Sequence, residues 1–549
     1  MTSSQWSLLA TRRYLPLFIT QSLGAFNDNL FKSGLLVAVV FGGLSVAGLD
    51  ARFLSNAAAG VFILPFLLFS ASAGQVAEIY DMARLARWIK GFEILIMALA
   101  AYGFIHHQAA ILMLCLFLMG THSSFFGPVK YAILPQYLKA SELVGGNALI
   151  EMATFMAILL GQVTGTQLQG HFAAQPGMLA GACLGVAVLG ALSSLAMPSL
   201  PALAPQLRFD ARWWRASWRL LQHSARELEL RHALLCISWF WFFGAVYLTQ
   251  WVAYVRDDLG GQPALLTLLI ALFSIGIGLG SLLCESLSGR RVELGLVPWG
   301  CLGLSLFGID LYAARPLHPA HAIGALDFIR AGHDRLLIDV LGLGVSGAWM
   351  TVPLYAHLQK RSRPEFRARA IAANNLLNAL FMVGASIFSA ILLAHGVKVP
   401  QLLLLVALLN AGVLLAMLLA QPLYLQRLLL WVMLRWRAAG VLEGESLLPA
   451  HGGVLLLCAA SVDPAHLIYL LPRPVRLLGH QRGAAPWWRR QVLHSAASRP
   501  PGGVEVCAGA SEDPASRGWI DQAQAEGWSI LQVQSGAQGL QLCPAQALP

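Results

Sequence analysis

Apolar runs recur along the first 420 residues of this 549-residue chain, and each is long enough to cross a lipid bilayer. A spanning helix needs about 20 predominantly apolar residues, because the hydrocarbon core is about 30 Å thick. Composition agrees, since 57% of the residues are hydrophobic and only 12% are charged, against roughly 25% charged in soluble domains. We therefore predict an all-α integral membrane protein over this region.

The apolar runs predict twelve membrane-spanning helices, at residues 14–41, 53–73, 89–105, 109–127, 146–168, 176–197, 234–255, 264–284, 294–314, 336–357, 366–394 and 401–421. The largest hydrophilic break, residues 198–233, falls between the sixth and the seventh. It divides an N-terminal six-helix bundle (1–197) from a C-terminal one (234–421). Two six-helix halves joined by a basic linker are typical of the major facilitator fold, in which the halves rock around a site near the membrane midplane.

The positive charges between the spans set the expected orientation. Positive residues are retained in the cytoplasm, and the first apolar run continues past position 40 without a cleavage site, so we expect no cleaved signal peptide and a cytoplasmic N-terminus. That side then carries most of the Lys and Arg, including Lys90, Lys130 and the six arginines of the linker. We expect a multi-pass membrane protein with both termini cytoplasmic. The net charge of +10 follows from this topology and from anionic lipid, and requires no nucleic-acid partner.

Two cytoplasmic junctions carry an acid followed by arginines. They are "GQVAEIYDMARLARW" after the second span and "SLLCESLSGRR" after the eighth. Both resemble the loop motif of the major facilitator superfamily, so we assign gating roles to Glu78, Arg84, Glu285 and Arg290. The alternative is that they are ordinary positive-inside loops. The eight cysteines form no CxxC pair or metal-ligand spacing, so we expect neither a metal site nor a cofactor.

The first span carries four strongly polar residues within "GAFNDNLFKSGLL". A charged residue at the centre of a spanning helix costs about 2.5 to 3.5 kcal/mol, so such residues usually face the bundle interior and mark a pathway. Asp28 and Lys32 are four residues apart and lie on one helical face, while Asn27 and Asn29 fall on other sides. We predict that these four line a wet substrate cavity. Alternatively, the charged pair only anchors the helix to a neighbour.

Polar residues recur in the fourth and fifth spans. Lys130 follows the Gly-Pro pair of "THSSFFGPVKYAILPQYL", and Glu151 lies one turn beyond Asn147 in "GGNALIEMATFMAILLGQ". Helices one, four and five thus present an anion, a cation and a second anion to one cavity. We predict that these residues bind substrate or a coupling ion; a salt bridge between Glu151 and Lys130 is the alternative.

The second half is poorer in charge. Its candidate substrate-binding residues are Tyr247 and Gln250 in the seventh span and Asn374 and Asn378 in the eleventh. Aromatic residues in membrane helices more often pack or face lipid, so Tyr247 also has a structural interpretation. The asparagines carry more weight, because amides in hydrocarbon need hydrogen-bond partners.

Several stretches together resemble the bacterial lysophospholipid transporters of the major facilitator superfamily. They are "GAFNDNLFKSGLL", "GPVKYAILPQ", "ELVGGNALIEMATFMAILLGQ" and "AIAANNLLNALFMVGAS". The resemblance implies a bacterial inner-membrane protein that moves lysophospholipids inward for reacylation. By position it assigns roles to Asp28, Lys130 and Glu151. Some members carry an arginine midway along the seventh helix, where this chain has Leu248. We therefore expect Lys32 and Lys130 to contact the lipid phosphate, as cations do.

The C-terminal region raises the alternative that the chain is an acyltransferase. Residues 422–440 predict an amphipathic helix at the cytoplasmic interface, and residues 441–549 resemble a degenerate glycerophospholipid acyltransferase in a small cytoplasmic α/β appendage, with "GGVLLLCAA" and "WSILQVQ" as strands. That chemistry needs His-x4-Asp, and no histidine here has an acid five positions later. Ala460 and Ala465 occupy the two places, with Asp463 and His466 nearby. We predict that the chain is not an enzyme; docking of a separate acyltransferase stays open.

Two functional hypotheses share this fold, which does not fix the substrate. The first is a lysophospholipid transporter working as a monomer by alternating access among membrane lipids. The alternative is an exporter of drugs or small amphiphiles. Headgroup preference and the driving ion remain open at this stage, since Asp28 and Glu151 suit coupling to protons or to sodium alike.

Overall fold

The computed structural model describes residues 5–41, 51–171, 175–316, 322–420, 422–434, 441–443, 454–458, 475–478, 504–508, 529–536 and 539–544. Within these residues, eleven helices are long and apolar enough to cross a membrane. Helix α1 (Leu15–Phe41) has 27 residues and is long enough to be a twelfth, although its polar residues lower its hydropathy. The prediction of an all-α, twelve-helix membrane domain is confirmed.

The N-terminal half contains six long helices. They are α1, α2 (Ala51–Ile79), α3 (Met82–Ile105), α4 (Ala109–Ala132), α6 (Leu143–His171) and α7 (Pro176–Leu195), with the short elements η1 (Gln5–Ala10), α5 (Leu134–Tyr137) and η2 (Ala140–Glu142) between or before them. Helix α1 packs on α6 and α7, α2 packs on α4, and α3 packs on α4 and α7. An apolar core from α1, α3, α4 and α7 includes Phe31, Met97 and Leu112.

The C-terminal half repeats this arrangement. Its long helices are α9 (Leu228–Ala253), α10 (Pro263–Ser288), α11 (Leu296–Ala314), α13 (Asp334–Arg361), α14 (Arg367–Ala394) and α15 (Val399–Ala420), with a π-helical turn η3 (Tyr254–Asp258), the short helix α12 (Ala325–Arg330) and η4 (Pro364–Phe366). Helix α10 begins with Pro263 in its first turn, where the missing N–H costs nothing. It ends at Gly289, whose φ of +61° places it in the left-handed conformation common at helix C-termini.

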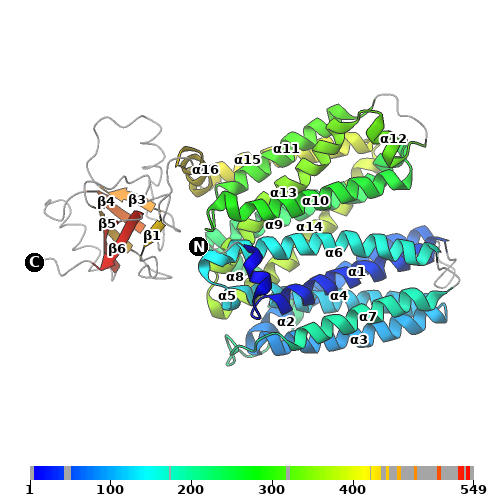
Figure 1. The fold of residues 1–549 in the computed structure, drawn as a ribbon, viewed down its shortest axis with the longest axis horizontal. Coiled ribbons are helices and arrows are strands. Elements are labelled where there is room, and N and C mark those ends of the chain that lie inside the picture. The colour runs from blue at the N-terminus through cyan, green and yellow to red at the C-terminus, as the bar shows by residue number, and fades with distance from the viewer. Residues whose placement is uncertain are drawn as a thin grey trace, which may run out of the picture. The chain divides into compact units, whose positions relative to one another are not determined.

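The two halves pack through α6 against α10 and through α2 against α14; Figure 1 shows the two groups of helices side by side. We call the end at which α2, α4, α10 and α13 finish the Glu78 end, and the opposite one the α12 end. Close approach at the Glu78 end depends on small residues. A Cβ on Gly74 of α2 would lie 2.7 Å from Ala372 Cβ of α14, closer than atoms can pack.

One helix boundary changes the interpretation of the sequence. The third span was expected from residue 89, but α3 begins at Met82, because the Asp81 side chain accepts hydrogen bonds from the backbone N–H groups of Ala83 and Arg84. Such a cap satisfies N–H groups that a helix start leaves free. Lys90, counted above as a loop charge, is therefore inside α3 and fully buried. That part of the charge count is wrong.

The linker between the halves also contains a helix. Helix α8 (Trp213–Arg226) lies within the predicted hydrophilic break, and it contacts α2, α14 and α9. Gln75 of α2 holds the preceding segment, accepting a hydrogen bond from the Asp210 backbone N–H at 2.8 Å. Trp213, Trp214 and Trp218 are exposed beside arginines on a strongly amphipathic helix.

The C-terminal region forms a unit of its own that includes residues 414–549. It contains α16 (Pro422–Leu434), in the stretch predicted to be an amphipathic helix, and the strands β1 (Val441–Glu443), β2 (Val454–Cys458), β3 (Val475–Leu478), β4 (Val504–Ala508), β5 (Ser529–Gly536) and β6 (Gly539–Pro544). The strand order is β1-β6-β5-β2-β4-β3. All neighbours are parallel except β5 and β6.

Both strands predicted in this region exist, as β2 and β5, and they are adjacent and parallel. Parallel pairing requires a crossover connection, which is typical of α/β units. Ala460, Asp463, Ala465 and His466 lie outside the described residues.

Candidate functional site

Asp28 of α1 is partly buried within the N-terminal half. One of its carboxylate oxygens accepts a hydrogen bond from Ser123 Oγ of α4 at 2.6 Å, while the other is buried without a partner. Lys32, one turn further along α1, places its ammonium 5.3 Å from the centre of the Phe62 ring of α2. No ion pair within 4.0 Å joins Asp28 to Lys32. The two charges are thus not paired directly with each other.

Lys130 of α4 and Glu151 of α6 lie near one another without forming the salt bridge that was the alternative. Glu151 is buried, and it accepts a hydrogen bond from Tyr131 Oη at 2.5 Å. The Lys130 ammonium lies 4.4 Å from the centre of the Tyr131 ring. The charges of both Glu151 and Asp28 act on Lys130, so the three predicted charges share one electrostatic environment.

Tyr131 also connects this group to the C-terminal half. Its ring stacks on that of Tyr355 of α13, with the centroids 4.5 Å apart and the planes at 4°. The Asn374 amide of α14 donates to Tyr355 Oη at 3.3 Å. Asn374 therefore belongs to the same contact chain as Glu151, which extends across both halves. Below, "the chamber group" means Asp28, Lys32, Lys130, Glu151 and Tyr131.

Asn147 occupies a second contact across the halves. Its amide nitrogen donates to Gln359 Oε1 of α13 at 2.8 Å, and Gln359 Nε2 donates back to Asn147 Oδ1 at 2.9 Å. Both side chains are fully buried. A reciprocal amide pair satisfies every atom it uses, so Asn147 holds α6 to α13 in this conformation.

Asn378 lies in a polar cluster of the C-terminal half. With its amide oriented to suit its neighbours, the nitrogen donates to Ser238 Oγ at 2.9 Å and the oxygen accepts from Asn374 Nδ2 at 3.0 Å and Trp241 Nε1 at 3.1 Å. Asn374 and Asn378 therefore contact each other, as their shared helical face predicts.

The two residues predicted in the seventh span, Tyr247 and Gln250, make their contacts away from the chamber group. The Tyr247 hydroxyl donates to the Leu403 carbonyl of α15 at 3.0 Å, which fits the structural interpretation of this buried side chain. Gln250 donates only a long hydrogen bond, 3.4 Å, to the neighbouring Thr249. Neither residue contacts the chamber group.

Sequence reasoning missed a buried charged cluster beside Asp28. Lys90 Nζ lies 2.6 Å from Glu93 Oε2, and both side chains are at most 1% exposed. Asn27 of α1 donates to Glu93 Oε1 at 2.7 Å, and His122 Nε2 of α4 lies 3.2 Å from Glu93 Oε2. The four residues form what we call the Lys90 cluster, and its charges act on Asp28.

A glycine in α1 leaves room for the Lys90 side chain. A Cβ on Gly24 of α1 would lie 2.5 Å from Lys90 Nζ, so glycine at this position lets the ammonium reach α1. Lys90 and Glu93 are three residues apart on one apolar helix, a spacing that pairs side chains. That spacing was the available signal, and the early placement of Lys90 in a loop hid it. Asn29, by contrast, bonds only to the Ala25 carbonyl of its own helix.

The two acids assigned to gating lie at the Glu78 end, and each contacts the opposite half. Glu78 of α2 accepts from Arg369 Nε of α14 at 2.6 Å and from the Arg369 backbone N–H at 3.1 Å. Glu285 of α10 accepts from the Gln5 backbone N–H at 3.0 Å. These contacts hold the halves together at this end.

The two arginines assigned to gating behave differently. Arg290 Nε lies 3.3 Å from Glu285 Oε1, so this arginine and acid are paired. Arg84 is exposed, and the cation paired with Glu78 is Arg369. Glu78 lies on the second long helix of the N-terminal half, and Glu285 lies on the second long helix of the C-terminal half. Each of these acids contacts the opposite half.

Metal binding has no support from the described side chains. Among the residues that the structure describes, no group of three or more His, Cys, Asp or Glu side chains could hold a metal ion. Cys115, Cys183, Cys236, Cys284 and Cys301 are buried thiols that form no disulfide.

Known proteins resemble this chain in sequence and in fold. The family model described as Major Facilitator Superfamily matches residues 14–385. A lysophospholipid transporter, LplT, of Escherichia fergusonii is 28% identical over 391 residues, covering 70% of this chain and 89% of that protein. The solved human organic anion transporter MFSD10 (TETRAN) has a TM-score of 0.58 at 15% identity, covering 73% of this chain and 99% of that one. The fucose:proton symporter FucP of E. coli has a TM-score of 0.54 at 16% identity, covering 73% and 97%.

Proposed function

Because the chain belongs to the Major Facilitator Superfamily, we propose that it is a secondary transporter that carries lysophospholipids across a bacterial inner membrane by alternating access. Lysophosphatidylethanolamine is a representative substrate, delivered to the cytoplasmic leaflet for reacylation. The observation that carries the proposal is the similarity to relatives named lysophospholipid transporters, which this chain matches over 89% of the length of one of them.

The chamber group suits the head of such a lipid. Moving a zwitterionic or anionic head through hydrocarbon costs its hydration, and fixed charges can replace that hydration. Lys32 and Lys130 are the cations of the group, and neither is within 4.0 Å of a carboxylate among the described residues. We assign the lipid phosphate to them, as charge-assisted hydrogen bonds favour. Asp28 and Glu151 complement a cationic headgroup or a coupling ion.

We assign the conformation described here to the state of the alternating-access cycle in which the cytoplasmic side is closed. With the positive-inside orientation, the Glu78 end is cytoplasmic and both termini are cytoplasmic too. The cross-half contacts of Glu78 with Arg369, of Asn147 with Gln359 and of Tyr131 with Tyr355 then close the cytoplasmic side. A head bound to the chamber group would reach the cytoplasm only after these contacts break.

We assign no acyl-transfer activity to the C-terminal region, because the sequence lacks the His-x4-Asp pair that this chemistry needs. Recruitment of a separate acyltransferase by this region is part of the proposal that product is consumed at the cytoplasmic face. Monomeric function is the simplest arrangement, since each chain contains both halves.

Uptake of labelled lysophosphatidylethanolamine by spheroplasts tests the function, with acyl transfer by the purified protein measured in parallel. We expect uptake without acyl transfer. Lys130→Ala should lower uptake at normal membrane expression, because it removes a phosphate contact. Acyl transfer without uptake would replace the transporter with an enzyme, and unchanged uptake in both Lys32→Ala and Lys130→Ala would refute the assignment of the phosphate. Export of unrelated amphiphiles without lysolipid uptake would favour a drug exporter.

A further inference from the structure

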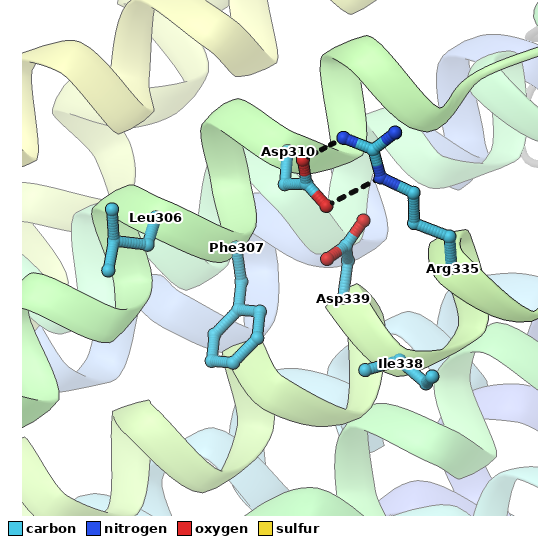
Figure 2. A pocket seen from close by; sticks show the side chains of 6 residues that line it. All are labelled: Leu306, Phe307, Asp310, Arg335, Ile338 and Asp339. Atoms are coloured by element: carbon cyan, nitrogen blue, oxygen red, sulfur yellow. Dashed lines mark hydrogen bonds and ion pairs between the residues drawn. The ribbon is translucent and has the colours of Figure 1, made fainter.

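A pocket of about 500 Å³ lies between α11 and α13 at the α12 end, opposite the cytoplasmic contacts. Figure 2 shows the six residues that line it, Leu306, Phe307, Asp310, Arg335, Ile338 and Asp339. Leu306 and Ile338 are exposed, as residues that face lipid are. Two acids and one arginine in this apolar setting call for a physical explanation, because charged residues inside spanning segments are costly.

Among the described residues, Arg335 forms a direct ion pair with only one of the two acids, Asp310. Its Nε donates to Asp310 Oδ2 at 2.9 Å, and a second guanidinium nitrogen bonds to Asp310 Oδ1. Asp339 is only 2% exposed, and its Oδ2 is buried without a hydrogen-bond partner. In Figure 2 its carboxyl group points toward Asp310 and Arg335. The group as a whole carries one uncompensated negative charge when both acids are ionised.

The Asp310 and Asp339 carboxyl groups face each other (Figure 2), and the two acids interact. Two facing carboxylates repel and do not both ionise readily, and a buried carboxylate oxygen without a partner costs free energy. One monovalent cation between them removes both costs. A proton is the smallest such cation, and it turns the contact between Asp310 and Asp339 into a carboxyl–carboxylate hydrogen bond.

Larger cations fit these observations less well. No group of three or more possible metal-ligating side chains exists among the described residues, and an arginine bonded to one of the two acids opposes a metal ion electrostatically. The ammonium group of a lipid would need access to Asp339 Oδ2, which is buried. A proton needs neither a ligand shell nor an open path of that width.

We propose that Asp310 and Asp339 form a proton-binding site, in which one proton lies between the two carboxyl groups and Arg335 balances the remaining charge. The Asp310 and Arg335 side chains are 38% and 64% exposed, so the site exchanges protons through the pocket with the α12 side. Release of the proton leaves two carboxylates facing each other and loosens α11 from α13 at this end. This proposal does not rest on the identity of the transported substrate.

One other titratable group is linked to the site. Tyr254 of η3 has a buried hydroxyl without a hydrogen-bond partner, and its hydroxyl interacts electrostatically with Asp339 as well as with Asp258 and Arg315. A neutral tyrosine hydroxyl is compatible with either protonation state of Asp339. It does not supply the missing positive charge.

Infrared difference spectroscopy of the full-length protein in detergent, between acidic and alkaline pH, tests the site. The wild type should show the carbonyl band of a protonated carboxylic acid that is lost at alkaline pH. Asp339→Asn should remove one such component, and Asp310→Asn should remove or shift the same component because the proton is shared. Asp334→Asn, an exposed acid in the first turn of the same helix, should leave the band unchanged.

Thermal unfolding of the same proteins gives an independent readout. The proton is held in the folded state, so the stability it contributes is present at acidic pH and is lost as the pH rises. The unfolding temperature of the wild type should therefore fall toward alkaline pH more steeply than that of Asp339→Asn. An unchanged infrared band in both Asp310→Asn and Asp339→Asn overturns the proposal. So does sodium-dependent stabilisation of the wild type at constant ionic strength that Asp339→Asn abolishes.

Discussion

At the scale of single residues, the Lys90 cluster lies beside Asp28 of the proposed headgroup site. Asn27 donates to Glu93, and the next residue, Asp28, accepts from Ser123. Two adjacent residues of α1 are thus fixed by α3 and α4 at the same time. These two hydrogen bonds, together with the packing of α1 on α6 and α7, fix the rotation of α1 about its axis and with it the direction of Asp28.

Removing the cation of this cluster should be costly. Lys90→Ala leaves the Glu93 carboxylate buried without its ammonium partner, which typically costs about 3 to 5 kcal/mol. We expect a clear loss of stability, measured by denaturant-induced unfolding in detergent. The double variant Lys90→Met with Glu93→Leu removes both charges and should recover much of this loss. Equal stability of Lys90→Ala and the wild type would show that the pair is not formed.

Glycine substitutions provide a second check on the position of Lys90. Gly24→Ala places a methyl group 2.5 Å from Lys90 Nζ, so the ammonium must move away from α1 and the cluster should loosen. Gly91→Ala, where a methyl group meets nothing within 4 Å, is the matched control. Only the first substitution should lower stability; an equal effect of both would mean that helix propensity, not the cluster, controls the response.

At the scale of the elements, the pairs of helices that join the halves are equivalent. Helix α2 approaches α14 at Gly74, and α10 contacts α6, where a Cβ on Gly145 would lie 3.3 Å from the Glu285 carboxylate. In each case an acid of the first helix contacts the other half, Glu78 through Arg369 and Glu285 through Gln5. A rocking motion of the halves must break both pairs of contacts.

Gly74→Ala should therefore hinder closure of the Glu78 end, since the added methyl would lie 2.7 Å from Ala372 Cβ. Spin labels at Tyr80→Cys and Arg363→Cys, both exposed, report the separation of the halves when Cys458, Cys507 and Cys543 are replaced by serine. We expect longer distances in Gly74→Ala. Gly60→Ala on the same helix, with nothing within 4 Å, should match the parent protein. Identical distributions in all three would contradict this account of closure.

The sequence predicted the helices well and their partners less well. Hydropathy locates apolar spans, so all twelve were found, but polar residues at helix starts made α3 begin too late in the prediction. Lys90 was lost for that reason. Tertiary partners are not encoded in local periodicity, so the pairing of Glu78 with Arg369 and of Asn147 with Gln359 could not be predicted. The linker helix α8 was also missed, because its arginines make it hydrophilic on average.

At the scale of the whole molecule, charged side chains gather at two separate places. We propose that the chamber group takes the lipid head near the contacts between the halves, and that the pair Asp310 and Asp339 takes a proton near the α12 end. At both places, the charged side chains are incompletely neutralised when no ligand is bound. Such residues are expected to reduce the stability of the fold, which makes a purely structural role a poor explanation for them.

The central claim is that the chamber group binds the head of a lysophospholipid. Equilibrium binding of labelled lysophosphatidylethanolamine to the purified full-length protein tests it most directly, comparing Lys130→Ala with Lys398→Ala, an exposed lysine at the α12 end. A charge-assisted hydrogen bond contributes about 1.5 to 3 kcal/mol, so Lys130→Ala should weaken binding roughly 10- to 100-fold. Lys398→Ala should leave it unchanged. Equal affinity of the wild type and Lys130→Ala would contradict the account.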